Sequence, residues 1–239
     1  MEFTNVYQDQ KRADSYSKLE FPGTYYLAFR DLPEIIENHV KGKMALDFGC
    51  GAGRSTRFLK KLGFITKGVD ISQDMLDKAF EIEPGSDYQL INKGELNNID
   101  SDSYDIILSA FTFDNIATFE IKLNLFKEFK RVLKPGGIII NLVSSPELYV
   151  NEWASFSTKD FAGNFTAKCG DKVYTIMLDV EDKRPVEDIL WPTEDYKKIY
   201  RDAGFELLQT YNPLGYETEP VQWVNEKMIA PWTIYVLKK

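Results

Sequence analysis

The feature that most constrains this chain is an apolar segment that runs into a glycine-rich turn, Ala45-Leu46-Asp47-Phe48-Gly49-Cys50-Gly51-Ala52-Gly53. A second apolar segment follows and ends in Gly68-Val69-Asp70. A strand, a glycine turn, a helix and a second strand with an acid at its end form a nucleotide-binding βαβ unit. In such a unit the glycines let the backbone approach a ligand, and the acid accepts the hydroxyls of a ribose. The sequence therefore predicts a ligand site where these two strands end.

The spacing of the glycines excludes two common phosphate sites. A dinucleotide fingerprint would place glycine at position 54, where this chain has Arg54, and no Lys-Ser/Thr pair follows to form a P-loop. The pattern is instead D-x-G-x-G-x-G, with Asp47 at the end of the strand. A carboxylate in this place favours an amine or ammonium partner over a pyrophosphate, because opposite charges attract.

Three later segments extend this pattern into that of a known family. Residues 104–110 (YDIILSA) resemble its fourth strand, residues 131–137 (RVLKPGG) the turn before its fifth strand, and residues 138–140 (III) that strand. As an ordered set over residues 43–145, the chain resembles the class I S-adenosylmethionine-dependent methyltransferases, in particular their small-molecule, type 11/25-like branch. The resemblance implies S-adenosylmethionine as the cofactor and S-adenosylhomocysteine as its product.

Strands that alternate with helices predict an α/β domain with a doubly wound, Rossmann-like, mostly parallel sheet of seven strands. Ser72 is expected to cap the helix that follows the second strand. The predicted strands up to the fifth are 44–48, 65–69, 88–91, 106–109 and 138–140, and the helices between them are 55–62, 73–80 and 121–133.

The alternation stops after residue 145. Residues 173–178 form a strand-like run after a turn at 169–172, which predicts an antiparallel lid inserted after strand five. Residues 205–210 and 233–237 are the expected last strands, and the long connection between them is of a kind that is often functional. The sequence thus predicts one domain with four parts: an N-terminal helical cap (1–42), the cofactor-binding core (43–145), the lid (146–193), and a C-terminal helix with two strands (194–239).

Composition limits the partners. A chain of 239 residues with 44% hydrophobic residues fits one domain, and its net charge of −8 argues against nucleic acid as a partner. The basic stretch from Lys122 to Lys134 fits the solvent face of an amphipathic helix. We expect no metal site, no membrane segment and a cytoplasmic location, because the two cysteines form no metal-ligand set and no leader or long apolar run is visible.

The resemblance assigns the cofactor contacts. Asp70 is expected to bind the ribose hydroxyls, with a simple loop or capping acid as the alternative, and Ile71 and Met75 to flank the adenine unless they are ordinary core residues. Arg30 is expected to bind the cofactor carboxylate, or else to pair with a neighbouring acid on the surface. Asp47 is expected to reach the ammonium, directly or through water. The rest of the assigned set is the turn residues Gly49, Cys50, Gly51 and Gly53, then Ser109, and for the adenine amine Glu95 or the backbone of Gly94 to Leu96.

The acceptor side is less constrained by the sequence. Asp114 follows the fourth strand and is predicted as a general base or substrate anchor, with an N-cap of a helix near residue 116 as the alternative. Aromatic residues of the cap, lid and last loop are predicted to surround a cyclic or amine-bearing acceptor, or alternatively to fill a second core or a homodimer face of the lid. The predicted acceptor contacts are Tyr25, Asn115, Tyr149, Trp153, Trp191 and Trp223.

These residues predict a methyltransferase that moves a methyl group to an O or N atom of a small molecule by in-line displacement. Transfer to carbon or to a carboxylate is the alternative reaction. A non-catalytic protein that binds S-adenosylmethionine is the alternative from another class.

Overall fold

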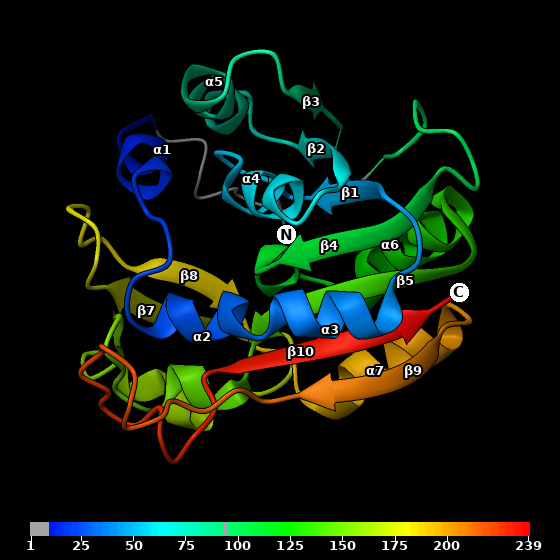
Figure 1. Cartoon of the computed structure of the whole chain (residues 1–239). Coiled ribbons are helices and arrows are strands. Elements are labelled where there is room, and N and C mark those ends of the chain that lie inside the picture. Colours follow the sequence, from blue (N-terminus) through cyan, green and yellow to red (C-terminus); the bar gives the residue numbers. More distant parts are fainter. Residues whose placement is uncertain (1–9, 93–94) are drawn as a thin grey trace.

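The computed structural model describes residues 10–92 and 95–239. Its central sheet has seven strands in the order β3-β2-β1-β4-β5-β10-β9 (Figure 1). Strands β1 to β5 are parallel, and β10 runs antiparallel to both of its neighbours. The bounds are β1 Met44–Phe48, β2 Ile65–Asp70, β3 Asp87–Leu90, β4 Tyr104–Ala110, β5 Leu133–Ser144, β9 Glu206–Tyr211 and β10 Trp232–Lys238.

Helices cover both faces of this sheet because alternate residues of each strand point to opposite sides. On β4, Ile106 and Leu108 belong to the core cluster that contains α2, α3 and α4. Ile107 belongs to the cluster on the other face, with α6 and α7. The helices are α1 Gln10–Ser17, α2 Thr24–Arg30, α3 Leu32–His39, α4 Arg54–Lys61, α5 Gln73–Ile82, α6 Phe119–Val132 and α7 Thr193–Asp202.

The predicted antiparallel lid is present as a separate three-stranded sheet in the order β6-β7-β8. In Figure 1, β7 and β8 lie beyond the ends toward which β1 and β4 point. The lid therefore covers the carboxyl edge of the parallel strands, where ligands bind in open α/β sheets. Its strands are β6 Phe156–Ser157, β7 Lys172–Met177 and β8 Val186–Ile189, with the short 3₁₀ helices η3 Pro146–Tyr149 and η4 Ala162–Thr166.

Of three local predictions, one is confirmed and two are wrong. The side chain of Ser72 accepts a hydrogen bond from the Met75 backbone N–H, so the predicted cap of α5 is confirmed. The helix expected near residue 116 is wrong, because α6 begins at Phe119 with Thr118 as its cap. The solvent-exposed role expected for Lys122 is also wrong: its side chain is fully buried, and its ammonium donates to the Phe113 carbonyl.

The long connection between β9 and β10 is held by one buried acid. Glu226 is fully buried, and its carboxylate accepts hydrogen bonds from Thr24 Oγ1 of α2 and from the Ala154 N–H of the lid, both at 2.7 Å. The same carboxylate accepts the backbone N–H groups of Val224 and Asn225. This carboxylate therefore joins the helical cap, the lid and the last loop.

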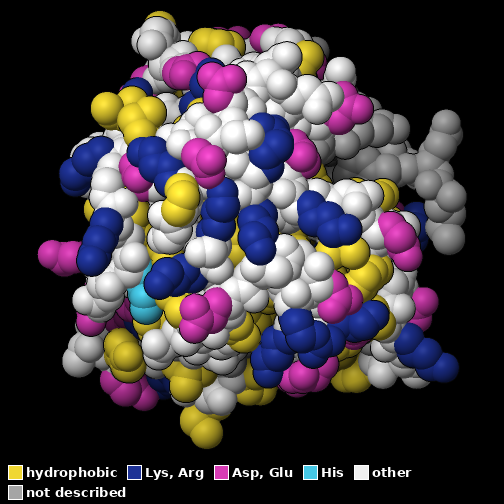
Figure 2. Space-filling model, turned by 90° about the vertical axis from the view of Figure 1, so that its right-hand side faces the viewer, with side chains coloured by type: hydrophobic (Ala, Val, Ile, Leu, Met, Phe, Trp, Pro, Cys, Tyr) yellow, Lys and Arg dark blue, Asp and Glu magenta, His cyan; other side chains and the backbone are white. Residues whose placement is uncertain are grey.

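The surface opposite the lid has mixed charge. Figure 2 shows the side at which the parallel strands begin, where Lys and Arg lie between Asp and Glu. Within residues 10–92 and 95–239, no helix is both long and apolar enough to cross a bilayer.

Candidate active site

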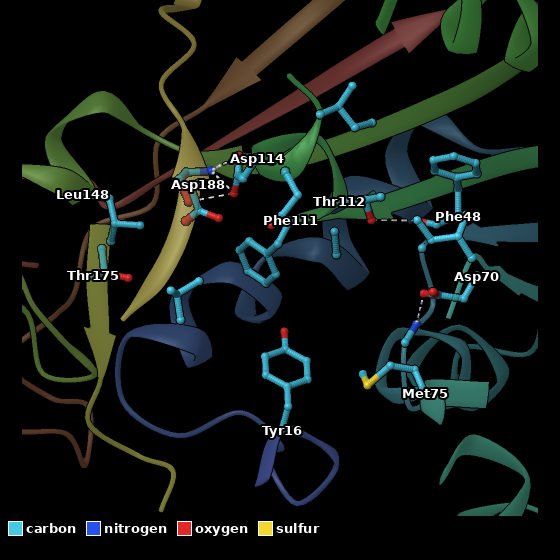
Figure 3. A pocket seen from close by; sticks show the side chains of 18 of the residues that line it. Tyr16, Phe48, Asp70, Met75, Phe111, Thr112, Asp114, Leu148, Thr175 and Asp188 are labelled. Atoms are coloured by element: carbon cyan, nitrogen blue, oxygen red, sulfur yellow. Dashed lines mark hydrogen bonds between the residues drawn. The ribbon is translucent and has the colours of Figure 1, made fainter. Parts of the chain in front are cut away.

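A cavity of about 270 Å³ opens at the carboxyl ends of β1, β2 and β4 and extends under the lid (Figure 3). Its position matches the switch point of the sheet, where the strand order reverses between β1 and β4. Asp70 and Met75 lie at one end of the cavity, and Asp114 and Asp188 lie at the other. The predicted site residues in its wall are Tyr25, Gly49, Gly51, Asp70, Ile71, Met75, Asp114 and Asn115.

A hydrogen bond joins the glycine turn to Asp70. The Asp70 carboxylate accepts the Gly51 N–H at 2.8 Å and the Ser72 N–H at 2.9 Å. Burial raises the pKa of this carboxyl group, and the backbone hydrogen bonds oppose the shift. Gly51 has a φ of +52°, and a Cβ there would lie 2.9 Å from Met75 Cε. Glycine thus keeps this stretch of backbone open to a ligand.

Asp47 does not contribute to the wall of the cavity. Its carboxylate is fully buried and accepts hydrogen bonds from Ser55 Oγ at 2.8 Å and Thr56 Oγ1 at 2.6 Å. Desolvation raises its pKa to about 6. The cavity wall therefore gives no support to the predicted direct contact with a ligand ammonium, and the predicted contact through water stays a prediction. Its Oδ1 has no hydrogen-bond partner among the described residues.

The other two turn residues also lie outside the main cavity. Gly53 has a φ of +81°, and a Cβ there would lie 2.2 Å from Tyr88 Oη. Glycine at this position therefore lets the start of α4 pack against Tyr88. Cys50 lines a smaller cleft of about 40 Å³, where Arg54 is also found. Arg54 donates to the Glu20 carbonyl and to Tyr16 Oη, which fixes α1 and its following segment over the turn.

Arg30 is directed away from the cavity. Its guanidinium pairs with Asp31 and Glu219, each at 2.7 Å, and donates to the Leu214 carbonyl at 2.9 Å. It also lies 4.6 Å from the centre of the Tyr216 ring. The alternative of a pair with Asp31 is therefore confirmed, and nothing in the cavity wall supports the predicted contact with the cofactor carboxylate.

We expect Arg30→Ala to leave the affinity for S-adenosylmethionine within about twofold of the wild type, since its partners all lie outside the cavity. Calorimetric titration checks this. The variant should unfold at a lower temperature, because a half-buried set of ion pairs is lost. A tenfold loss of cofactor affinity in a folded variant would restore the original assignment.

The adenine-side prediction after β3 has no support in the cavity wall. Gly94 lies outside the described residues, Glu95 is exposed, and Leu96 is buried in the core with its carbonyl bound by Arg131. Ser109 is also fully buried, within β4, and does not line the cavity. Ile91, which was not predicted, forms this part of the wall instead.

Three of the predicted acceptor aromatics pack elsewhere. Trp153 is in the core with its indole N–H on the Leu148 carbonyl, and Trp223 donates to the Tyr216 carbonyl. Trp191 belongs to the core between α6 and α7. Tyr149 is buried behind the wall. The aromatic residues that line the cavity, other than Tyr25, are Tyr16, Phe48, Phe111, Phe156 and Trp232.

The acceptor end of the cavity carries two buried acids. Asp114 lies in the 3₁₀ helix η2 (Thr112–Asn115) after β4 and accepts the N–H and the hydroxyl of Ser144, the latter at 2.7 Å. Asp188, on β8 of the lid, was not predicted and accepts Tyr149 Oη at 3.2 Å. Burial raises the pKa of both carboxyl groups, and the charge of Asp114 raises that of Asp188 further. Burial lowers the pKa of Lys122, which lies behind Phe113.

These shifts predict a pH-dependent effect of Asp188→Asn on stability. A carboxyl group with a raised pKa in the folded state stabilises the fold below its unfolded pKa, and this contribution is lost as the pH rises through the folded pKa. The variant should therefore match the wild type near pH 4 and be more stable by about 1–3 kcal/mol at pH 8. Lys122 is present in both proteins, and the difference therefore reports the Asp188 carboxyl group together with its interaction with Lys122. Denaturant unfolding across this range checks it; a difference that does not grow with pH would contradict the burial argument.

A doubly wound sheet with a glycine turn, a terminal acid and a cavity at its switch point defines a nucleotide-binding α/β protein of the Rossmann-like class. Residues 46–141 match the family model of a methyltransferase domain. Residues 46–141 therefore carry the sequence pattern of a methyltransferase domain, and the whole chain has the fold of solved S-adenosylmethionine-dependent methyltransferases.

Individual relatives agree with this assignment. The N-demethylindolmycin N-methyltransferase of Streptomyces griseus is 23% identical over 201 residues, which are 83% of this chain and 84% of that protein. The demethylmenaquinone methyltransferase of Bacillus subtilis (strain 168) is 27% identical over 180 residues, 72% and 74% of the two chains. The CcbJ methyltransferase of Streptomyces caelestis shares the fold with a TM-score of 0.69 at 20% identity, covering 99% of this chain and 98% of that one.

The site fits S-adenosylmethionine, the cofactor of this family. Asp70 presents an acceptor for ribose hydroxyls, while Ile71, Met75 and Ile91 provide apolar walls for a flat base. Gly49 and Gly51 line the cavity, where a Cβ atom on either would collide with Thr112 or Met75.

Proposed function

We propose that this enzyme transfers the methyl group of S-adenosylmethionine to an O or N atom of a small molecule by direct in-line displacement. The observation that carries the proposal is one continuous cavity with the glycine turn and Asp70 at one end and Asp114 at the other. The bound cofactor supplies an activated methyl group on a sulfonium. The enzyme then has to align a nucleophile behind that methyl group and exclude water.

The proposed roles follow the position of each group. Asp70 binds the ribose, Gly49 and Gly51 admit the amino-acid end, and Ile71 and Met75 flank the adenine. Asp47 acts through its buried Oδ1 and a bridging water. Asp114 serves as acceptor anchor or base, and the lid closes the acceptor end over Tyr25 and Asn115.

The proposed organisation is one domain, with the cap (1–42), core (43–145), lid (146–193) and C-terminal part (194–239) folding around this cavity. Contacts of Glu226 with both α2 and the lid support a single unit. A homodimer through the lid and the absence of a nucleic-acid partner stay predictions.

Two measurements test the function. Calorimetry with S-adenosylmethionine and S-adenosylhomocysteine measures cofactor binding, and a methyl-labelled cofactor with a panel of amines, alcohols, phenols and carboxylic acids measures transfer. Binding together with transfer to an amine or hydroxyl supports the proposal. Binding with no transfer across the panel would favour a non-catalytic role, and transfer to carbon or carboxylate would replace the proposed acceptor.

A further inference from the structure

Two carboxylates from distant parts of the chain meet at the acceptor end of the cavity. Asp114 comes from the segment after β4, and Asp188 comes from β8 of the lid. Figure 3 shows the two side chains beside each other, on the opposite side of the cavity from Asp70 and Met75. Asp114 is 5% exposed and Asp188 8% exposed, so water screens neither acid well.

The wall around these acids supplies no positive charge. Among the described residues that line the cavity, none is Lys, Arg or His. Behind the wall, the Lys122 ammonium donates to the Phe113 carbonyl and lies 4.9 Å from the centre of the Trp191 ring. The Arg54 guanidinium lies 4.9 Å from the centre of the Tyr25 ring. A cation bound between the two acids would favour their ionised forms, which burial disfavours.

The groups that face Asp188 come from four elements. Tyr149 Oη of η3 donates to it, Asp114 of η2 lies beside it, Lys122 of α6 is the nearby cation, and Glu187 precedes it on β8. Within the described part of the chain, Tyr149 is the one side-chain donor to this carboxylate. A carboxylate has room for further hydrogen bonds, so Asp188 keeps acceptor capacity for a ligand.

Beside these acids and the polar Thr175, Ser144 and Asn115, this end of the cavity is lined by aromatic and apolar side chains. Tyr25, Phe111, Phe156 and Trp232 form a cluster of mutually contacting rings with centroid distances of 4.8 to 5.8 Å. Such a wall binds an apolar or aromatic body, and ring faces also attract a cation.

We propose that Asp188 and Asp114 together bind the amino group of the methyl acceptor, which makes the acceptor a small amine with an apolar or aromatic body. This inference rests on the proposed function and selects N over O as the methylated atom. A bound ammonium supplies the positive charge that the wall lacks. A carboxylate-bearing acceptor would instead place a third acid beside these two without a counter-charge, so the proposal excludes this class.

The same pair accounts for the proton that an amine must lose. An ammonium has no free lone pair, so one carboxylate takes one proton from the nitrogen and becomes a neutral carboxylic acid, while the amine becomes neutral and nucleophilic. The raised pKa of Asp188 favours this proton acceptance.

The test measures binding, so that it does not depend on turnover. The protein is first saturated with S-adenosylhomocysteine and then titrated with 2-phenylethylamine, 2-phenylethanol or phenylacetate at pH 7, by calorimetry or ligand-observed NMR. We expect the amine to bind at least about tenfold more tightly than the alcohol, and phenylacetate not to bind. Asp188→Asn should weaken amine binding by about tenfold and leave alcohol binding unchanged.

A matched control lies next to Asp188 on the same strand. Glu187 points to the other face of β8 and pairs with Lys172 and Tyr174, so Glu187→Gln removes a neighbouring lid carboxylate that does not line the pocket. This variant should bind the amine as the wild type does. Thermal unfolding of each variant establishes that it is folded.

Equal binding of amine and alcohol, no amine binding, or an amine affinity unchanged in folded Asp188→Asn would each overturn the inference. Binding of S-adenosylhomocysteine, measured first, distinguishes failure of this inference from failure of the proposed function. Failure of the protein to bind S-adenosylhomocysteine removes both proposals, whereas normal binding without amine preference removes only the acid-pair assignment.

Discussion

Glu226→Ala is expected to destabilise the protein more than any other single change considered, by about 3–4 kcal/mol. The substitution leaves Thr24 Oγ1 and the N–H groups of Ala154, Val224 and Asn225 without their buried acceptor. Because these donors belong to the cap, the lid and the last loop, all three lose an attachment at once. Chemical denaturation followed by circular dichroism gives the change in the free energy of unfolding.

The same loop offers a control for this prediction. Glu217 is exposed and pairs with Lys227 on the surface, so Glu217→Ala should change the free energy of unfolding by about 0.5 kcal/mol or less. Similar stability of the two variants would mean that the Glu226 carboxylate does not hold the loop.

Asp70→Ala is expected to weaken binding of S-adenosylmethionine by about 1–3 kcal/mol, or roughly tenfold to a hundredfold. The variant loses the proposed acceptor for the ribose hydroxyls. It also frees the Gly51 and Ser72 N–H groups that the carboxylate now holds at 2.8 and 2.9 Å, so the glycine turn loses its support. Calorimetric titration with the cofactor measures the change.

Asp77→Ala is the matched control, because Asp77 is an exposed acid of the adjacent helix α5 that bonds only Gln73 among the described side chains. Its cofactor affinity should equal that of the wild type. An unchanged affinity in Asp70→Ala would show that this acid serves only the turn.

Local patterns predicted which strand ends and which following residues form one end of the cavity. Strand β1 has the predicted bounds, Ser72 caps α5, and Asp70, Ile71 and Met75 line the cavity. These positions follow from a βαβ unit, in which short-range turn geometry and strand direction fix where the end of each strand lies.

Residues whose role depends on distant partners were predicted poorly. Arg30 was placed on the cofactor, but Glu219, far along the chain, pairs with it. Lys122 fits a solvent face by helical spacing, yet α7 and Trp191 cover it. Trp153 and Trp223 were assigned to the acceptor by composition, which does not say toward which side an aromatic ring packs.

The role of Asp188 could be predicted from the sequence only in part. Alternation along β8 places Val186 and Asp188 on the same face, and both line the cavity. The alternation could be found in the sequence, but the side of the lid that faces the core could not.

The amino-acid sequence by itself determined the α/β class, the glycine turn and the acid that follows it, because each depends on residues close together in the chain. Only the tertiary structure decided which side chains surround the acceptor, since the lid strands, η2 and β10 meet there through long-range packing. The pairing of Asp114 with Asp188 belongs to this second group. It arises because the lid folds back over the carboxyl edge of the sheet and brings two acids, separated along the chain, into one pocket.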